Sequence, residues 1–179
     1  MAINKLTCPF PSNINPLSSG GFKLSIQKLP EIEFWCNEAN LPGMSIGAAT
    51  QSSPFSQVPT PGDVINYDTL NVQFMIDAEM VNYKALWFWM YGIGFPESYD
   101  NFQELLDADT RGLTGNAAKI VSDGSLTVLN NSFLPVKVIQ FIDMWPTNIN
   151  SLQLMANNSD VVYLMGNATF NYSHWKFAD

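Results

Sequence analysis

The sequence predicts a mostly β fold, an antiparallel β-sandwich or barrel with one inserted α-helix and long extended loops. Three observations support this fold class. Apolar and polar residues alternate in several separate segments, which is typical of half-buried strands. Only one segment has apolar residues at helical spacing, and stretches rich in Pro and Gly separate the patterned segments. We treat residues 1–179 as one domain, because no composition break or internal repeat divides the chain.

The N-terminal segment predicts an irregular arm followed by a first strand. Residues 1–20 are rich in Pro, Asn and Ser and contain no apolar run of the kind found in signal peptides, so we expect no export by the usual secretory route. Residues 21–29 then alternate apolar and polar side chains. The alternation predicts a strand that directs one set of residues inward, namely Phe22, Leu24 and Ile26.

A second strand is predicted over residues 31–39, which place Ile32, Phe34 and Cys36 on one face. A turn is expected before it at Leu29-Pro30, because proline lacks an N–H group and disfavours helical geometry in the residue that precedes it.

Residues 41–66 are predicted to form an extended loop or hairpin. This segment contains four prolines and three glycines, with isolated apolar residues between them. A loop of this length is uncommon in a compact domain unless it has a function. It could lie on the domain's own surface, but its exposed apolar residues favour contact with a neighbouring subunit.

A strand over residues 69–76 and the single predicted helix follow. We expect the helix over residues 77–92, capped by Asp77 and terminated by Gly92. Its apolar stripe is predicted to pack in the core, since such stripes are usually core faces. The stripe contains Met80, Tyr83, Trp87, Met90 and Tyr91.

The C-terminal half predicts strands after an irregular region over residues 93–122. Two strands over 124–129 and 134–144 are joined by a turn at 130–133, and a long last strand is expected over 160–175. Its inward face would contain Val162, Leu164, Ala168, Phe170 and Tyr172.

Composition limits the function. Hydrophobic residues make up 46% of the chain and charged residues only 13%, so we expect part of the surface to be buried against other copies. The net charge is −8 and Lys and Arg form no cluster, which argues against a nucleic-acid-binding protein. An acidic surface would instead suit a passage through which nucleic acid slides without binding.

No catalytic, cofactor-binding or metal site is predicted. The single histidine, His174, has no nucleophile motif near it, and Cys8 and Cys36 are expected to be free thiols. Asp107, Asp109 and Gly112 match part of a calcium loop, but Arg111 and Ala118 occupy positions that need oxygen ligands. No apolar run is long enough to span a membrane, so no membrane insertion is expected.

Three blocks of sequence resemble the tail tube proteins of contractile-tailed, T-even-like bacteriophages. They are FWCNEANLPG at 34–43, the segment from Pro61 to Met90, and WPTNINSLQL at 145–154. The third block is the most specific of the three. Independently of the resemblance, the Trp145-Pro146 pair in this block predicts a structural corner. After the corner, Leu152 and Leu154 are expected to return to the core on the next strand.

The resemblance implies a β-barrel or sandwich whose copies form hexameric rings, and rings that stack into a rigid tube inside a contractile sheath. The tube of type VI secretion systems shares that architecture. The implied role is structural, not enzymatic: the tube conducts the genome during ejection, and DNA passes through it without specific binding. Its implied partners are other copies of itself and the sheath, baseplate and tape-measure proteins. The implied location is the virion tail, assembled in the cytoplasm of the host bacterium.

Three other functions stay open on the sequence alone. A baseplate protein that initiates the tube would have the same fold. A soluble carbohydrate-binding β-sandwich module could use exposed aromatic residues such as Trp145 or Trp175. A glycosidase using the acidic residues of the region after Gly94 is the weakest alternative.

Overall fold

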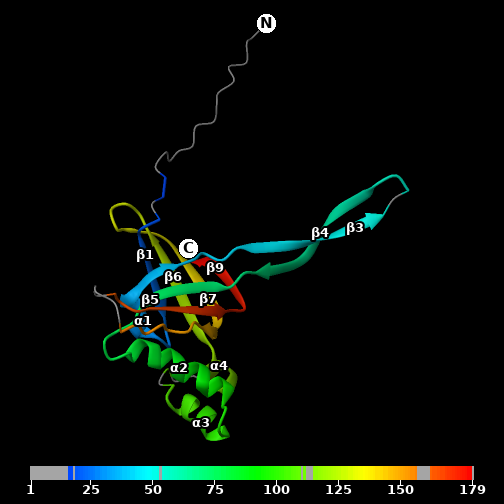
Figure 1. The fold of residues 1–179 in the computed structure, drawn as a ribbon. Helices are drawn as coiled ribbons and strands as arrows, with labels where there is room; N and C mark the ends of the chain where they lie inside the picture. The colour runs from blue at the N-terminus through cyan, green and yellow to red at the C-terminus, as the bar shows by residue number, and fades with distance from the viewer. Residues whose placement is uncertain are drawn as a thin grey trace.

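The computed structural model describes residues 16–17, 19–52, 54–109, 111, 115–156 and 162–178. It consists of a β-sandwich body, a group of helices at one end of that body, and a long hairpin that projects from its side (Figure 1). The described part is mostly antiparallel β-structure, as predicted, but it contains four helices where the sequence predicts one. Most of the predicted arm, 1–20, lies outside the described residues.

Two groups of antiparallel strands form the body, and they share one long strand. The first group consists of β1 (Phe22–Ile26), β6 (Ser122–Leu129), β7 (Pro135–Ile149) and β9 (His174–Ala178). The second consists of β2 (Cys36–Ala39), β5 (Leu70–Met75), β8 (Met165–Asn171) and the end of β7. The strand order along the whole sheet is β1-β6-β7-β8-β5-β2, with β9 paired to β7.

Strand β7 bends where it changes partners. Residues before Met144 pair with β6 and β9, whereas Trp145 pairs with Asn171 of β8. Asp143 has a φ of 53° at this point, and the pairing is irregular between Pro146 and Asn148. The Trp-Pro pair therefore lies inside the strand that connects the two groups of strands, just after its bend.

One part of the predicted corner is wrong. Leu152 and Leu154 do not return to the core on another strand: no strand is assigned to residues 150–156, and Leu154 is 80% exposed. The last strand is also shorter than expected. It begins at Met165 and is interrupted after Asn171, and beyond Tyr172 and Ser173 the chain continues in the same direction along β7 as β9, since β8 and β9 both pair antiparallel to β7. Val162 lies exposed before β8 instead of on its inner face. Residues 160 and 161, where it was expected to begin, lie outside the described part.

The core lies between the two groups of strands, and alternate residues of β1, β5, β6, β7 and β8 fill it. Phe74 of β5 is fully buried beside Gly166, where a Cβ atom would lie 2.8 Å from the Phe74 ring. The inward residues of the strands form one cluster that includes Leu24, Ile26, Leu70, Val72, Phe74, Leu126, Ile139, Phe141, Ala168 and Phe170.

Helix α1 (Pro30–Trp35) replaces the first half of the strand predicted over 31–39, and only Cys36–Ala39 form β2. Proline is well tolerated in the first turn of a helix, where its missing N–H would have no partner, and Glu31 and Glu33 suit the positive end of the helix dipole. Ile32 is buried, but Phe34 is 83% exposed, so the predicted common face does not exist.

Helix α2 (Val81–Gly94) differs from its predicted limits at both ends. It begins at Val81, four residues after Asp77, and its N-cap is Met80, which has a left-handed φ of 54° and makes no side-chain capping hydrogen bond. It continues through Gly92 to Gly94. Gly92 faces Leu105 of the next helix, and a Cβ atom there would lie 2.6 Å from the Leu105 Cβ. The glycine permits close helix packing and does not terminate the helix.

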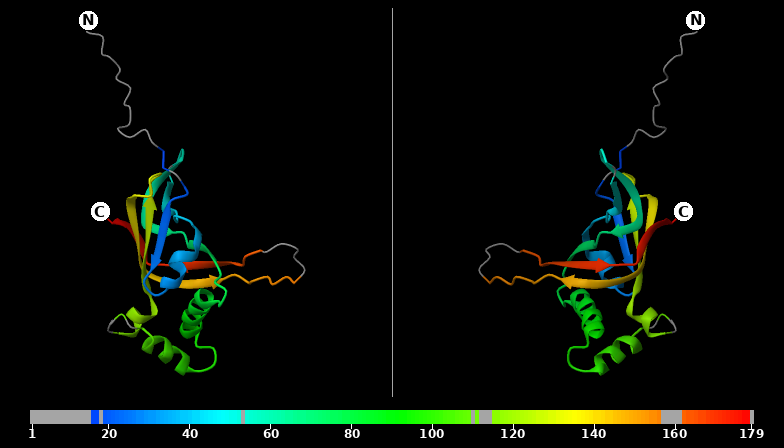
Figure 2. Two further views of the ribbon diagram at one scale, coloured as in Figure 1. Left: turned by 90° about the vertical axis from the view of Figure 1, so that its left-hand side faces the viewer. Right: turned by 90° about the vertical axis from the view of Figure 1, so that its right-hand side faces the viewer.

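The predicted irregular region after α2 contains helices α3 (Tyr99–Asp107) and α4 (Asn116–Ile120). The Ser98 side chain accepts a hydrogen bond from the Asp100 N–H and caps α3. Leu105 and Leu106 are buried. Helices α2, α3 and α4 gather at one end of the sandwich (Figures 1 and 2).

Residues 44–67 form a two-stranded antiparallel hairpin, with strands β3 (Met44–Ser52) and β4 (Gln57–Tyr67). These strands pair with each other and with no other described strand. The hairpin leaves the body between β2 and β5 and extends well beyond it (Figure 1).

Candidate assembly surfaces

The projecting hairpin exposes apolar side chains along its length. Its residues 44–67 contain one charged side chain, Asp63. Phe55, near the tip, is 99% exposed, and Val64 is 64% exposed. A hairpin of two strands is at best marginally stable on its own in water. A hairpin of this length with a single charge and exposed apolar side chains is therefore typical of a segment that another protein surface covers.

Two glycines shape the middle of the hairpin. The register shifts between Ile46 and Ala48, and a Cβ atom at Gly62 would lie 2.5 Å from the Gly47 carbonyl oxygen. The strands can approach this closely only because Gly62 has no side chain. A bulge of this kind bends a hairpin and increases its twist, which sets the direction in which the distal half projects.

The predicted core stripe of α2 lies on the wrong face of the helix. The buried residues are Asn82, Leu86, Trp89 and Gly92, whereas Met80 and Trp87 are 40% and 45% exposed. The helix is apolar around its whole circumference, so its sequence gives no preference for one inner face. The body covers the Leu86–Trp89 side and α3 covers Gly92, which leaves the other aromatic side less covered.

That less covered side, here called the aromatic face, consists of the exposed Trp87 and the half-buried Met90 and Tyr91, with Tyr83 at its border, where it packs partly against the core. The Trp87 and Tyr91 rings stack with centroids 4.5 Å apart and an interplanar angle of 27°. A shallow hollow runs from these residues to Asn148 and Ile149 at the end of β7. A stacked, half-exposed Trp-Tyr pair beside an apolar hollow is typical of a protein contact surface.

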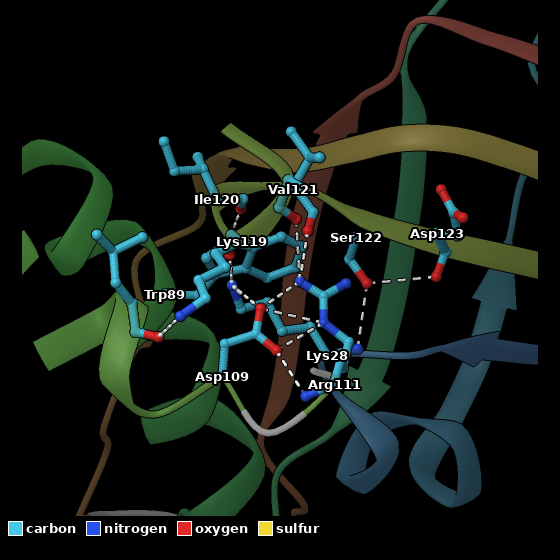
Figure 3. A network of polar contacts seen from close by, with 11 residues as sticks. Lys28, Trp89, Asp109, Arg111, Lys119, Ile120, Val121, Ser122 and Asp123 are labelled. Atoms are coloured by element: carbon cyan, nitrogen blue, oxygen red, sulfur yellow. Dashed lines mark hydrogen bonds and ion pairs between the residues drawn. The ribbon is translucent and has the colours of Figure 1, made fainter. Parts of the chain in front are cut away.

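A network of ion pairs and hydrogen bonds holds the segment after α3 onto the body (Figure 3). The Asp109 carboxylate is 1% exposed and accepts two-point hydrogen bonding from the Arg111 guanidinium, with Nη2–Oδ2 at 2.5 Å and Nε–Oδ1 at 2.9 Å. Lys28 Nζ lies 3.6 Å from Asp109 Oδ2 and 5.5 Å from the centre of the Trp89 ring.

The same side chains also fix the backbone around α4. Arg111 donates to the carbonyl oxygen of Val121 at 2.9 Å, and the indole N–H of Trp89 donates to that of Ile120 at 2.7 Å. Lys28 Nζ donates to the carbonyl oxygen of Lys119. Because Arg111 lies beside it, the pKa of the Asp109 carboxyl is well below its usual range, and burial lowers the pKa of Lys28 to about 8. These interactions connect the end of α4 to α2, to the segment after α3 and to Lys28, which lies two residues before α1.

The structure does not support a metal site at the calcium-like residues. Asp109 is committed to Arg111 and Lys28, and Asp107 is exposed. Within the described ranges, no group of three or more His, Cys, Asp or Glu side chains is arranged to hold a metal ion. Gly112 lies outside those ranges.

The remaining candidate residues are dispersed. His174 is exposed at the start of β9. Cys36 is a half-buried free thiol, and burial raises its pKa to about 11; Cys8 lies outside the described residues. Trp145 and Trp175, the aromatic residues considered for carbohydrate binding, are both partly buried against the core. None of the helices in the described part is both long and apolar enough to cross a membrane.

The fold and these surfaces define a class of protein: a β-sandwich subunit with a projecting apolar hairpin, suited to assembly. The family model for phage tail tube proteins matches residues 5–178. The chain therefore belongs to the phage tail tube protein family, and its role is that of a structural component of the virion tail. No curated protein sequence matches the chain.

Solved structures with the same fold come from contractile injection systems. A chain of the anti-feeding prophage baseplate, determined with six-fold symmetry, has a TM-score of 0.60 at 12% identity, covering 92% of this chain and 96% of that one. A chain of the sheath-tube complex of an extracellular contractile injection system, PVC, has a TM-score of 0.56 at 10% identity, covering 91% of each. The tube-terminating cap of the anti-feeding prophage has a TM-score of 0.55 at 10% identity, with 97% and 98% covered.

Proposed function

We propose that this protein is the subunit of a phage tail tube, that six copies form a ring, and that rings stack into the inner tube of a contractile tail. The genome passes through this tube during ejection, and the protein catalyses no reaction. One observation supports the proposal above all others: the hairpin over 44–67 projects from the body with exposed apolar residues and a single charge. Such a segment needs a neighbouring subunit to cover it.

The aromatic face of α2 supports the same conclusion from a different part of the molecule. It offers a second uncovered apolar area, centred on Trp87 and Tyr91. A ring requires two different patches on each subunit, because a head-to-tail contact joins one patch to the other and closes when the rotation is right. The hairpin and the aromatic face are two such patches, and the hairpin projects from the side of the body whereas α2, which carries the aromatic face, lies at its helical end (Figure 1).

The proposed partners follow from the family. Other copies of this chain are the first partner, and the sheath, baseplate and tape-measure proteins are the others. The similar injection-system proteins belong to a six-fold symmetrised baseplate and to a sheath-tube complex. Assembly takes place in the cytoplasm of the host bacterium, and the tube does not insert into a membrane as part of this role.

Negative-stain electron microscopy and sedimentation of the purified protein test the proposal. Rings or tubes with six-fold symmetry are the expected result. A monomer that persists at high concentration, in the presence of purified sheath protein as well as alone, would refute it.

The hairpin's part is tested separately. Deletion of residues 45–60, or the double substitution Phe55→Ser with Val64→Ser, should abolish rings and leave the unfolding free energy of the subunit nearly unchanged, because these side chains do not contact the core. Val136→Ser, at an exposed valine outside the hairpin, is the control. Unchanged rings and unchanged tube length after the deletion would show that the hairpin makes no essential contact.

A baseplate initiator is the second candidate function. The observation in its favour is that a baseplate chain is among the similar structures, at a TM-score of 0.60. An initiator should form rings that do not extend into tubes without a separate tube protein. Long tubes formed by the purified chain alone would exclude this candidate.

A further inference from the structure

One outer face of the sandwich carries amide and hydroxyl side chains in place of charged ones. It belongs to β2, β5, β8 and the last residues of β7, and its side chains point away from the core. Around one shallow depression on this face lie Glu38, Asn40, Asn71, Gln73, Asn150, Asn167 and Thr169. We call this surface the amide face.

Lateral hydrogen bonds hold several of these side chains along the sheet. The Thr169 hydroxyl donates to Asn71 Oδ1 at 2.9 Å, across the paired strands β8 and β5. Asn40 Oδ1 accepts from the Asn71 backbone N–H at 2.6 Å, and the Asn148 amide donates to Asn150 Oδ1 at 3.1 Å. These bonds between neighbouring short side chains hold several donors and acceptors in fixed positions along the sheet.

Charge is distributed unevenly between the two groups of strands. In β2, β5, β8 and residues 145–149, the single charged residue is Glu38. The other group contains Lys23, Asp123, Lys137, Asp143 and Lys176. Residues 77–109, which include α2 and α3, hold seven of the sixteen Asp and Glu and one lysine. The net charge of −8 therefore does not describe the amide face.

We propose that the amide face lines the lumen of the tube, as a wall for the passing duplex that carries no Lys or Arg and, per subunit, the single charge of Glu38. This inference rests on the proposed function and adds which face meets the nucleic acid. Binding to duplex DNA gains most of its free energy when Lys and Arg neutralise phosphates and release counterions. A wall without Lys or Arg provides no such binding free energy. A hydrogen bond from its amides to a phosphate replaces one to water of similar free energy, so the amides do not hold the DNA.

The topology allows this face to continue from one copy to the next. Strand β2 ends the sheet on one side, and residues 145–149 pair with β8 alone among the described strands, so both borders of the four-stranded group are open. The hairpin continues directly from β2 and β5 beyond the body (Figure 1). Open borders and a projecting hairpin are the means by which sheets of separate chains join.

Size-graded thiol labelling of assembled tubes tests the placement. In a Cys8→Ser, Cys36→Ser background, Asn71→Cys and Asn167→Cys place a thiol on the amide face. Gln140→Cys places the control thiol on the outer face of β7, where Gln140 is exposed. In tubes, a small maleimide should label all three, whereas a maleimide on a large polyethylene glycol should label only Gln140→Cys. Dissociated subunits should react with both reagents at every position.

The outcomes separate the lumen assignment from the proposed function. If the unmodified protein forms no rings or tubes, the proposed function fails and the lumen assignment with it. If tubes form and the large reagent labels Asn71→Cys or Asn167→Cys in them, the lumen assignment alone is overturned.

Added lysines test the absence of Lys and Arg from the wall. Tubes of the Asn71→Lys, Asn167→Lys variant, assembled with short duplex DNA, should retain at least about tenfold more nuclease-protected DNA than unmodified tubes, because each lysine adds a phosphate contact. The control variant, Ser125→Lys with Gln140→Lys, adds two lysines at paired positions of β6 and β7, outside the amide face. DNA bound there would lie on the outside of the tube, so nuclease should digest it. Equal protection in the two variants, or no protected DNA in the first, would overturn the proposal.

Discussion

Replacement of Asp109 by asparagine should destabilise the subunit more than any other isosteric change of a charged residue in the ion network. The side chain is 1% exposed, and its carboxylate faces two cations that are themselves largely buried, Arg111 at 17% and Lys28 at 11% exposed. Asp109→Asn keeps the shape of the side chain and removes its charge. Both cations are then left in a poorly hydrated site without a counterion.

The expected cost is about 3–5 kcal/mol of unfolding free energy, the usual effect when one partner of a buried ion pair is removed. The lower part of this range applies if Lys28 releases its proton, which its pKa of about 8 makes possible near neutral pH. Arg111 cannot release its proton. In the variant it would stay charged without a counterion while still donating to the Val121 carbonyl oxygen.

Guanidinium unfolding of dilute subunits at pH 7, followed by tryptophan fluorescence, measures the effect. Asp107→Asn, two residues earlier on the exposed side of α3, is the matched control and should change stability by less than about 0.5 kcal/mol.

The pKa of Asp109 is depressed in the folded state, so its contribution is present above the pKa of about 3.9 in the unfolded chain and is lost as pH falls below it. The difference between wild type and Asp109→Asn should therefore shrink below pH 4. A loss under about 1 kcal/mol at pH 7, or a difference that grows in acid, would refute this reasoning.

Three further changes have definite expected outcomes. Gly92→Ala should cost about 1–3 kcal/mol in chemical denaturation because its Cβ would overlap Leu105, whereas Gly94→Ala, with open space around it, should cost nothing. The unfolding free energy of the wild type should rise between pH 8 and about pH 10.5, because over this interval the unfolded chain still binds the Lys28 proton that the folded chain has released. Lys28→Met should remove this rise. A wild-type unfolding free energy that stays constant over the interval would contradict the lowered pKa of Lys28. Trp87→Ala should change subunit stability by less than about 1.5 kcal/mol, since the side chain is half exposed, and reduce ring formation measured by sedimentation; unchanged rings would show that the aromatic face is not a subunit contact.

Period-two patterns identified most of the strands, because alternation in a strand directly reports which side chains face the core. Phe22–Ile26, Leu70–Met75 and Ser122–Leu129 lie where the alternation predicts them, with alternate residues buried. The amides of Asn71, Gln73 and Asn167 and the hydroxyl of Thr169 occupy the outward positions of the same patterns. The amide face was therefore readable from the sequence once the pairing of β5 with β8 was known.

Short helices were the weakest part of the prediction. In α1, three alternating apolar residues suggested a strand, yet Pro30 and two glutamates favour the first turn of a helix, and the helix buries Ile32 alone. In α3, the signal existed in the sequence: Ser98 is a good N-cap, and Leu105 and Leu106 supply the buried side. The ion network gave no such signal, because Lys28 and Asp109 are far apart in the chain and meet only through the fold.

By itself the sequence determined the β character of the chain, its low charge, the segment over 44–67 with its single charge, and the residue blocks that resemble tail tube proteins. These properties depend on local pattern and composition. Only the tertiary structure decided which side of α2 is buried. Its residues are apolar on all sides, so the choice depends on where the body and α3 lie, and they cover Leu86 and Trp89 while leaving Trp87 exposed. Local periodicity cannot select a face when every face is apolar; contacts between distant segments make that choice.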